Sequence, residues 1–294
     1  MIEEKIAYIT LDLENDWYVE GGDQYRTLEY VDEFIELIDR VDVPVTLFTV
    51  GKLFEERPDD VEKLEEGLQS EFHLHSYAHD PEMKDGFRTD LLKGMDAYAS
   101  FFGEEPVGYR APLGKIAPGM LRTLEREGFT FDSSVFPSYR PGAYNNLSAP
   151  TNPYSPEATD ELVEFPVSVC PRIRIPLSQS YLKLLGRPYR WYVKSIPLPD
   201  QLVFVSHLHD FFDTPAFARR GQPTRAIQQR NIADSKRIFV DFIDHLKESG
   251  YAFDTLSGEN ARVSEGPDGV AASLDSHSSA KRRTESGGTE LDAR

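Results

Sequence analysis

The chain has 294 residues, of which 39% are hydrophobic, and a formal charge of −18 from 50 acidic and 32 basic residues. This acidic excess excludes a nucleic-acid-binding protein, because phosphates require a basic face. The length suffices for one large core, and the single cysteine, Cys170, excludes an intramolecular disulfide.

The acidic residues are spread along the whole chain rather than confined to one tail. Such a distribution suits a protein kept soluble in concentrated salt, so we expect a halophilic source, with an ordinary acidic cytoplasmic protein as the alternative. The first apolar run starts at Ile6, and no run of about eighteen apolar residues occurs. We therefore expect a cytoplasmic protein that has neither a secretory leader nor a membrane span.

Residues 6–17 read as an apolar strand that ends in three carboxylates, Asp12, Glu14 and Asp16. Strand alternation places Asp12 and Glu14 on the same face. A buried strand rarely ends in this much charge without a partner, so a bound cation is the expected partner. The alternative is a solvated strand end or a helix cap.

A βαβ unit follows, because residues 27–41 carry apolar side chains at helical spacing and residues 43–50 form a β-branched run closed by Gly51. Residues 71–80 then hold three of the seven histidines. His75 and His79 are four apart, so a helical turn directly after a strand would place both imidazoles on one side, where they can share a metal ion. His73 is expected to be a buried histidine satisfied by a backbone carbonyl.

The rest of the chain continues to alternate between helix and strand, which implies a parallel sheet. Helices are expected at 89–102, 118–127 and 231–247, and strands at 129–131, 162–169, 202–206 and 251–255. Polar, reactive groups end the short apolar runs at 108–112, 131–134 and 202–210. A parallel α/β barrel builds its active site from such strand ends at one face.

Two inserts and a tail interrupt this pattern. Residues 137–160 are rich in proline, asparagine, serine and tyrosine, and predict a long surface loop that lines a substrate groove. Residues 171–199 carry aromatic side chains among arginines and lysines, which suits stacking on sugar rings or contact with a membrane surface; a helix packed on the barrel is the alternative. Residues 258–294 predict a low-complexity, disordered tail, which leaves residues 1–257 as the barrel.

The G-x-S-x-G elbow, the phosphate-binding G-x-x-x-x-G-K and a strand-linked G-x-G-x-x-G are absent from the sequence. Serine hydrolases, nucleotide hydrolases and dinucleotide-binding enzymes therefore have no support. Metal-assisted hydrolysis remains, since two imidazoles and a carboxylate leave open positions for water and a substrate carbonyl.

The motifs together resemble the polysaccharide deacetylases, also called the NodB-homology or carbohydrate esterase family four domain. The resemblance covers roughly residues 6–255. It rests on five motifs in the family's order, namely the acidic strand end at Asp12 to Asp16, H-S-x-x-H at His75 to His79, R-x-P at Arg110 to Pro112, D-S-S at Asp132 to Ser134 and a strand ending in His207.

Two details of these motifs depart from the common pattern. The first motif is most similar to the D-V-E-D-W variant of the branch associated with exopolysaccharide and surface-glycan synthesis, with one residue inserted. This insertion leaves Glu14 and Asp16 as alternative carboxylate ligands, of which the strand period favours Glu14. Phe136 lies near the place where the fourth motif usually has tryptophan, so the acetyl pocket is expected to differ in shape.

The resemblance implies an α/β fold, a single irregular (β/α)7-type barrel, and a role for each motif residue. Asp12 would be the general base, paired with Arg110, and His207 the general acid, oriented by Asp132, with His209 as the rival of His207. The metal ligands would be His75, His79 and either Glu14 or Asp16. The substrate side would be formed by Tyr109, Pro112 and Leu113, the last through its backbone N–H at the oxyanion.

The implied activity is metal-dependent removal of N- or O-linked acetyl groups from a glycan or an N-acetylhexosamine-containing precursor. Zinc suits the ligand set best, and manganese, cobalt and nickel also fit it. The implied partner is an acetylated sugar or lipid-linked glycan met at the inner face of the membrane. The alternatives are a non-catalytic glycan-binding barrel and a same-family amidohydrolase that acts on a non-sugar amide.

Overall fold

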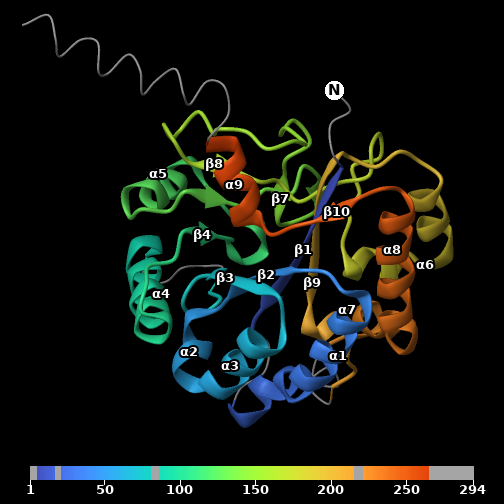
Figure 1. Ribbon diagram of the computed structural model, residues 1–294, viewed down its shortest axis with the longest axis horizontal. Helices are drawn as coiled ribbons and strands as arrows, with labels where there is room; N and C mark the ends of the chain where they lie inside the picture. Colours follow the sequence, from blue (N-terminus) through green and yellow to red (C-terminus); the bar gives the residue numbers. More distant parts are fainter. Residues whose placement is uncertain (1–4, 17–20, 81–85, 215–220, 265–294) are drawn as a thin grey trace, which may run out of the picture. The chain divides into compact units, whose positions relative to one another are not determined.

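The computed structural model describes residues 5–16, 21–80, 86–214 and 221–264, which form a curled, mainly parallel sheet surrounded by helices (Figure 1). The chain divides into two compact units, Met1–Leu256 and Ser257–Arg294. The first unit carries the whole sheet, and the described part of the second consists of the helical residues that follow Leu256. The remainder of the predicted tail, residues 265–294, lies outside the described residues.

The large sheet contains eight strands, and its order is β10-β1-β2-β3-β4-β5-β8, with β9 on the other side of β1. Every pairing in this sheet is parallel, as the alternation of strands and helices predicts. Its strands are β1 (Ile6–Leu13), β2 (Val45–Thr49), β3 (Ser70–Leu74), β4 (Gly108–Tyr109), β5 (Phe131–Asp132), β8 (Val163–Glu164), β9 (Gln201–His207) and β10 (Ala252–Phe253).

The sheet closes only loosely between β8 and β9. Ser168, just after β8, donates its backbone N–H to the carbonyl of Val203 in β9 at 3.0 Å, and its Oγ accepts from the N–H of Val203 at 2.9 Å. Short ladders and this single junction make the barrel irregular. The predicted irregular α/β barrel is confirmed, with eight strands in the sheet where a (β/α)7-type barrel was expected.

The helices surround the sheet in Figure 1, in which α6 and α8 lie next to each other beside β9. They are α1 (Val31–Val41), α2 (Gly51–Glu56), α3 (Pro58–Gly67), α4 (Phe87–Phe102), α5 (Pro118–Arg126), α6 (Gln179–Lys194), α7 (Thr224–Gln229) and α8 (Ser235–Glu248). A further helix, α9 (Leu256–Ser264), begins at the last residue of the first unit. Short 3-10 segments complete the fold at Gly21–Tyr30 (η1), Pro112–Gly114 (η2), Leu208–Asp210 (η3) and Ile232–Asp234 (η5). Within the described residues, no helix is long and apolar enough to cross a membrane.

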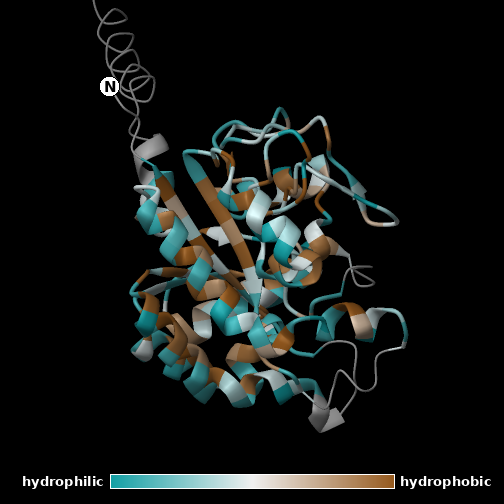
Figure 2. Cartoon of the chain, turned by 90° about the vertical axis from the view of Figure 1, so that its right-hand side faces the viewer, coloured by the Kyte–Doolittle hydropathy of each residue, from teal (hydrophilic) through white to brown (hydrophobic). Residues whose placement is uncertain are grey.

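Strand β1 is buried along its entire length, as expected of a central strand covered on both faces. In Figure 2 the strands at the centre are mostly brown, whereas the helices mix brown and teal. The outward residues of β1, such as Ile9 and Leu11, belong to the core between sheet and helices, whereas Tyr8 belongs to a separate cluster with Phe48 and Phe131. Asp12 lies four residues after Tyr8, which is two full periods of the strand, so its side chain points to the same inner face.

Glycine at position 108 allows the interior of the barrel to close. A Cβ built on Gly108 would lie 2.2 Å from the ring of Phe131 and 2.8 Å from that of His73. Any larger residue would therefore overlap the aromatic layer that fills the barrel below the catalytic end. This explains why the Gly108-Tyr109-Arg110 run begins with glycine.

Three parts of the fold differ from the expectations. Helices α2 and α3 have no counterpart among the predicted elements. The insert at 171–199 is not irregular, because most of it forms α6, so the alternative of a helix packed on the barrel is the correct one. The loop at 137–160 contains a small antiparallel pair, β6 (Tyr139–Arg140) with β7 (Tyr144–Asn145).

Candidate active site

The carboxyl ends of β1, β3 and β9 meet at a cavity of about 340 Å³. It is lined by Asp12, Glu14, His75, His79, Arg110, Leu113 and His207 among the predicted site residues, and also by His209. Parallel strands bring their carboxyl ends to one face, so residues almost two hundred positions apart converge here. The predicted grouping of strand ends is therefore present in the structure.

The two histidines of the H-S-x-x-H motif reach the cavity from a loop, not from a helical turn, so that expectation was wrong. Residues 75–80 contain no helix, and both Ser76 (φ 63°) and His79 (φ 54°) adopt left-handed backbone conformations. The Oγ of Ser76 accepts the backbone N–H of His79 at 3.0 Å. This bond turns the chain back, and the ring centroids of His75 and His79 lie 5.1 Å apart.

Glu14, His75 and His79 form a group whose ligand atoms all lie within 4.8 Å of one another. The Oε2 atom of Glu14 lies 2.7 Å from Nε2 of His79 and 4.0 Å from Nε2 of His75. All three side chains are buried. Burial raises the pKa of Glu14, but the imidazole of His79 outweighs this effect and holds that pKa well below its usual range. Glu14 is therefore ionised, as a metal ligand must be.

The tautomer of His75 is fixed by the backbone. Its Nδ1 lies 2.7 Å from the carbonyl oxygen of Arg110, so Nδ1 carries the proton and donates it to that oxygen. Its Nε2, which faces Glu14, is left with a free lone pair. Burial lowers the pKa of His75 to about 4, which keeps the ring neutral at neutral pH.

Asp16 lies outside this group. Its Oδ2 accepts the backbone N–H of Thr27 at 3.0 Å, and its own N–H donates to the carbonyl of Gln24 at 2.7 Å. Both contacts tie the end of the first motif to η1. Of the two alternative carboxylate ligands, the geometry places Glu14 with the histidines and gives Asp16 a bond to the backbone.

Arg110 is the best-connected side chain of the site and is only 1% exposed. Its Nη1 donates to Oδ1 of Asp12 and to Oγ1 of Thr10, each at 2.7 Å, and its other nitrogens donate to the carbonyl and hydroxyl of Ser133 at 2.8 Å. Its guanidinium also lies 4.1 Å from the ring centroid of Phe48. Burial raises the pKa of Asp12, but the charges of Arg110, His75 and His207 outweigh burial and lower it.

His207 has a carboxylate partner, but this partner is Asp210 and not Asp132. The Nδ1 of His207 donates to Oδ2 of Asp210 at 3.1 Å. Burial disfavours the imidazolium, yet the bond to Asp210 and the charges of Glu14 and Asp12 raise the pKa of His207 to about 9. Sequence reasoning missed Asp210, although its place three residues after His207 allows one turn of η3 to bring them together.

Asp132 is fully buried and serves the neighbouring loop. Its Oδ1 accepts the hydroxyl of Ser134 at 2.6 Å, and that hydroxyl oxygen in turn accepts the N–H of Ala111 at 2.7 Å. Burial raises the pKa of both Asp132 and its neighbour Glu164. In the structure the side chain of Asp132 bonds within this loop, whereas Asp210, and not the predicted Asp132, contacts His207.

Helix α6 contributes residues that the sequence did not indicate. Ser180 donates its hydroxyl to Oδ1 of Asp210 at 2.7 Å, and the Nζ of Lys183 lies 3.5 Å from the same oxygen. Burial raises the pKa of Asp210, but Lys183 and His207 outweigh it and hold it far below the usual range. Asp210 is thus a permanent anion between a lysine and the candidate acid.

The remaining histidines of the motifs lie in different places. The ring of His209 stacks on His207 at 4.6 Å, and its Nδ1 lies 3.5 Å from Oε1 of Glu14. Burial and the neighbouring charge of His207 lower the pKa of His209 to about 4. His73 lies inside the barrel, with Nε2 3.2 Å from Oε1 of Glu71.

Of the predicted substrate-binding residues, only Leu113 lines the cavity. It adopts φ 57° in η2, next to Gly114. Tyr109 is fully buried in the outer core, with its ring 5.8 Å from that of Phe87, because strand alternation turns it away from Arg110. Pro112 starts η2 and does not line the cavity. Tyr109 and Pro112 were therefore wrongly predicted.

Aromatic residues from other segments form the outer part of the cavity. Phe136 lines it and stacks on Tyr144 at 5.6 Å, with Tyr181 of α6 as a further lining residue. Phe136 thus stands in the cavity wall, as expected from its place after the fourth motif.

Comparison with known proteins agrees with this fold. Residues 3–131 match the family model described as polysaccharide deacetylase. The chain is 25% identical over 194 residues to the peptidoglycan deacetylase-like protein FGM2 of Gibberella zeae, a match that covers 64% of this chain. The chain spans 54% of the length of that relative.

Solved structures share the fold. A putative polysaccharide deacetylase from Mycobacterium smegmatis superposes with a TM-score of 0.53 at 20% identity, over 87% of this chain and 95% of that one. A carbohydrate esterase family four pseudoenzyme from Bacillus anthracis gives a TM-score of 0.51 at 13% identity, over 88% of this chain and 66% of that one.

These observations define the protein as an α/β barrel whose polar strand ends gather at one face. Residues 3–131 are similar to the polysaccharide deacetylase family, and the fold is shared with solved structures of carbohydrate esterase family four. The matched residues end at Phe131, so they include the first three motifs and exclude His207.

Proposed function

We propose that this protein is a metal-dependent hydrolase that removes N- or O-linked acetyl groups from a glycan or an N-acetylhexosamine-containing precursor. The observation that carries the proposal is the buried group of Glu14, His75 and His79, directly beside the Asp12–Arg110 pair. A non-catalytic glycan-binding barrel would need the aromatic wall of the cavity. It would need neither the ionised carboxylate of Glu14 nor the pairing of Asp12 with Arg110.

The residues present fit a divalent ion. Two imidazoles and one ionised carboxylate form an N/N/O donor set, and the cavity beside them has room for water and substrate. Zinc suits this set best, and manganese, cobalt and nickel are accepted by similar sets. When bound, the ion would lower the pKa of a water molecule and stabilise negative charge on the acetyl oxygen.

Asp12 is proposed to take the proton from the attacking water. Its Oδ1 is held by Arg110 at 2.7 Å, which leaves Oδ2 directed toward His207 and the cavity. The guanidinium keeps Asp12 ionised, so the base is ready at neutral pH. Since Arg110 is itself fixed by Thr10 and Ser133, the carboxylate has one defined orientation.

His207 is proposed to donate a proton to the departing amine or hydroxyl. Its raised pKa keeps the ring protonated at neutral pH, and Asp210 fixes the ring by binding Nδ1. The Nε2 atom is therefore the one that faces the cavity and carries the transferable proton. The backbone around Leu113 lies on the cavity wall and is proposed to bind the acetyl oxygen.

The proposed substrate is an acetylated sugar, free or linked to a lipid carrier. The cavity of about 340 Å³ is near the lower end of small-molecule sites, and Phe136, Tyr144 and Tyr181 offer flat faces for a pyranose ring. We retain the cytoplasmic location, the contact with the inner face of the membrane and the D-V-E-D-W branch as parts of this proposal.

The test is an acetate-release assay over a panel of acetylated sugars and lipid-linked glycans, with and without chelator and at high salt. We expect release that stops with chelator and returns with zinc. Glu14→Gln should abolish it, whereas Glu157→Gln, which removes the same charge from an exposed position, should not. Metal analysis of both variants provides a readout that does not depend on the choice of substrate. Stoichiometric metal in Glu14→Gln would exclude this site.

A further inference from the structure

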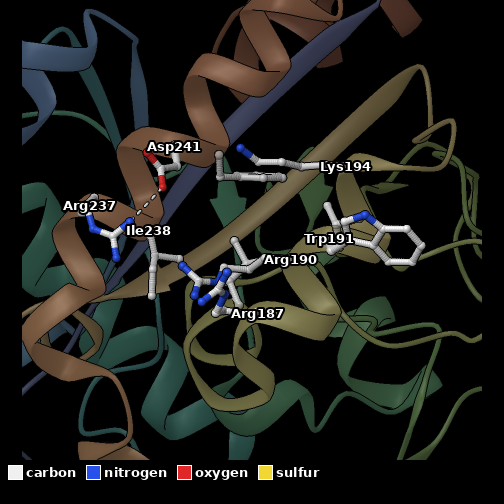
Figure 3. Close-up of a pocket in the computed structure, with 10 residues that line it drawn as sticks. Arg187, Arg190, Trp191, Lys194, Arg237, Ile238 and Asp241 are labelled. Atoms are coloured by element: carbon white, nitrogen blue, oxygen red, sulfur yellow. Dashed lines mark hydrogen bonds and ion pairs between the residues drawn. The ribbon is translucent and has the colours of Figure 1, made fainter.

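A second hollow lies away from the active site, between α6 and α8 (Figure 3). Its volume is about 590 Å³, and its floor is formed by apolar residues such as Leu182, Val193 and Phe242. Discrete small-molecule ligands occupy sites of roughly 300–1,000 Å³. We call this hollow the α6–α8 groove.

The α6–α8 groove is cationic in a protein whose formal charge is −18. Four cationic side chains and one carboxylate, Asp241, line it. The cations are Arg187, Arg190, Lys194 and Arg237. A concentration of positive charge on so acidic a chain indicates a negatively charged ligand.

Three of these cations have no anionic partner among the residues that the structure describes. Arg237 is compensated, because its nitrogens lie 3.1 Å from Asp234 and 3.5 Å from Asp241. Arg187, Arg190 and Lys194 make no ion pair in the described part of the chain. The Nε atom of Arg190 is moreover buried and has no hydrogen-bond partner among the described residues. A buried N–H of this kind is costly to leave unbonded, so an acceptor is expected to reach it.

The spacing of these residues places them on one face of α6. Positions 187, 190, 191 and 194 follow the i, i+3, i+4, i+7 pattern of a helical stripe. The three unpaired cations span about 10 Å along the helix axis. Figure 3 shows the guanidinium groups of Arg187 and Arg190 directed toward α8. This length suits two linked phosphate groups better than a single one.

Trp191 supplies a flat apolar surface at the edge of the groove. Its ring is 72% exposed and in Figure 3 points away from Arg237. An indole this exposed has not been placed there by the packing of the core. Next to arginines, it suits a ligand that carries a ring beside its charged group.

We propose that the α6–α8 groove is a binding site for an organic diphosphate, whose phosphates contact Arg187, Arg190 and Lys194 and whose ring stacks on Trp191. Arginine binds phosphate oxygens in pairs, which matches the unpaired guanidinium groups. The concave shape favours a discrete ligand over a flat anionic membrane. The part of α6 before its kink at Gly186 carries Ser180 and Lys183 of the active site, and the part after the kink lines the groove.

The test is calorimetric titration of the whole protein with inorganic pyrophosphate and with a nucleoside diphosphate, at the lowest salt that keeps it folded. Chelator is present throughout, so that neither probe is held by metal at Glu14. We expect Arg187→Gln/Arg190→Gln to weaken both probes at least tenfold. Trp191→Ala should weaken only the nucleoside diphosphate. The control, Arg122→Gln/Arg126→Gln, removes the same charge from the exposed surface of α5 and should bind as the wild type does.

Equal affinity in the arginine double variant and its control would overturn the proposal. The proposal would also be overturned if the protein bound vesicles of anionic phospholipid but neither soluble probe, because the groove would then be a membrane contact. Thermal melts of each variant show whether a loss of affinity reflects unfolding.

Discussion

The Nε2 atom of His207 lies 3.5 Å from Oδ2 of Asp12, so the candidate acid and the candidate base face each other at the ends of β9 and β1. The parallel register pairs the two residues directly. Each charge stabilises the other, which contributes to the lowered pKa of Asp12 and to the raised pKa of His207. Both groups are therefore in their working protonation states over one wide pH range.

We predict a bell-shaped pH profile with a broad plateau. The rate should fall in acid as Asp12 takes up a proton, below the usual range of an aspartate, and in alkali as His207 loses its proton near pH 9. Asp12→Asn and His207→Ala should each lower turnover by about 10²- to 10⁴-fold and keep the metal. In His207→Ala the alkaline limb should flatten.

The control for this assignment is His209→Ala. Its lowered pKa of about 4 means that His209 is neutral over the plateau and has no proton to donate. If the alkaline limb persisted in His207→Ala and disappeared in His209→Ala, the acid would be His209.

Metal content should separate the two carboxylates of the first motif. Glu14→Ala should lose stoichiometric metal, as should His75→Ala and His79→Ala, because the three side chains form one ligand group. Asp16→Ala should keep the metal and lose about 1.5–3 kcal/mol of folding stability, since a buried backbone N–H of Thr27 loses its charged acceptor. Metal analysis and denaturant unfolding measure the two effects. Equal metal loss in both variants would mean that the carboxylates act together.

Much of the site was predictable because strand geometry is regular. Alternation along β1 places Asp12 and Glu14 on one face, and parallel pairing brings His207 beside Asp12. The shared face of Asp12 and Glu14 follows from local sequence, since a two-residue period needs no knowledge of the distant chain. The position of His207 follows from the parallel sheet, whose strands all end at one face.

The parts that were missed depend on contacts between distant segments. The approach of His75 to His79 relies on left-handed residues held by the hydroxyl of Ser76, which no hydrophobic period encodes. Lys183 reaches Asp210 only because α6 packs beside β9. Tyr109 directly precedes Arg110, which lines the cavity. Successive side chains of a strand point in opposite directions, so Tyr109 packs in the outer core instead.

Removing Arg110 should cost more stability than removing any other site residue. Arg110→Met leaves the carboxylate of Asp12 buried without its cation, and such a loss typically costs about 3–5 kcal/mol. The pKa of Asp12 should rise, so the acid limb of any remaining activity should move to higher pH. Denaturant unfolding of Arg110→Met and of Asp12→Asn/Arg110→Met provides the check. The double variant should recover part of the loss, because its carboxylate is gone as well.

Stability should increase with salt. With a formal charge of −18, the folded chain repels itself, and the screening length falls from about 10 Å at 0.1 M salt to about 3 Å at 1 M. We expect the melting temperature to rise across this range in potassium chloride and to change much less in sucrose of equal osmolarity. A flat curve in potassium chloride would refute the proposed halophilic adaptation.

The last prediction separates the two aspartates that compete for the role of orienting His207. Asp210→Asn removes the anion that binds Nδ1 of His207, so the pKa of His207 should fall from about 9 toward its ordinary value, and the alkaline limb should move to lower pH. Asp132→Asn changes the same chemical group, but its contacts are with Ser134 and Glu164, so the limb should stay in place.

Loss of Asp210 also leaves Lys183 without its carboxylate, and a lower melting temperature is expected. Titration of the His207 ring by NMR separates this instability from the change in pKa. If Asp132→Asn shifted that titration and Asp210→Asn did not, the original assignment of Asp132 would be right.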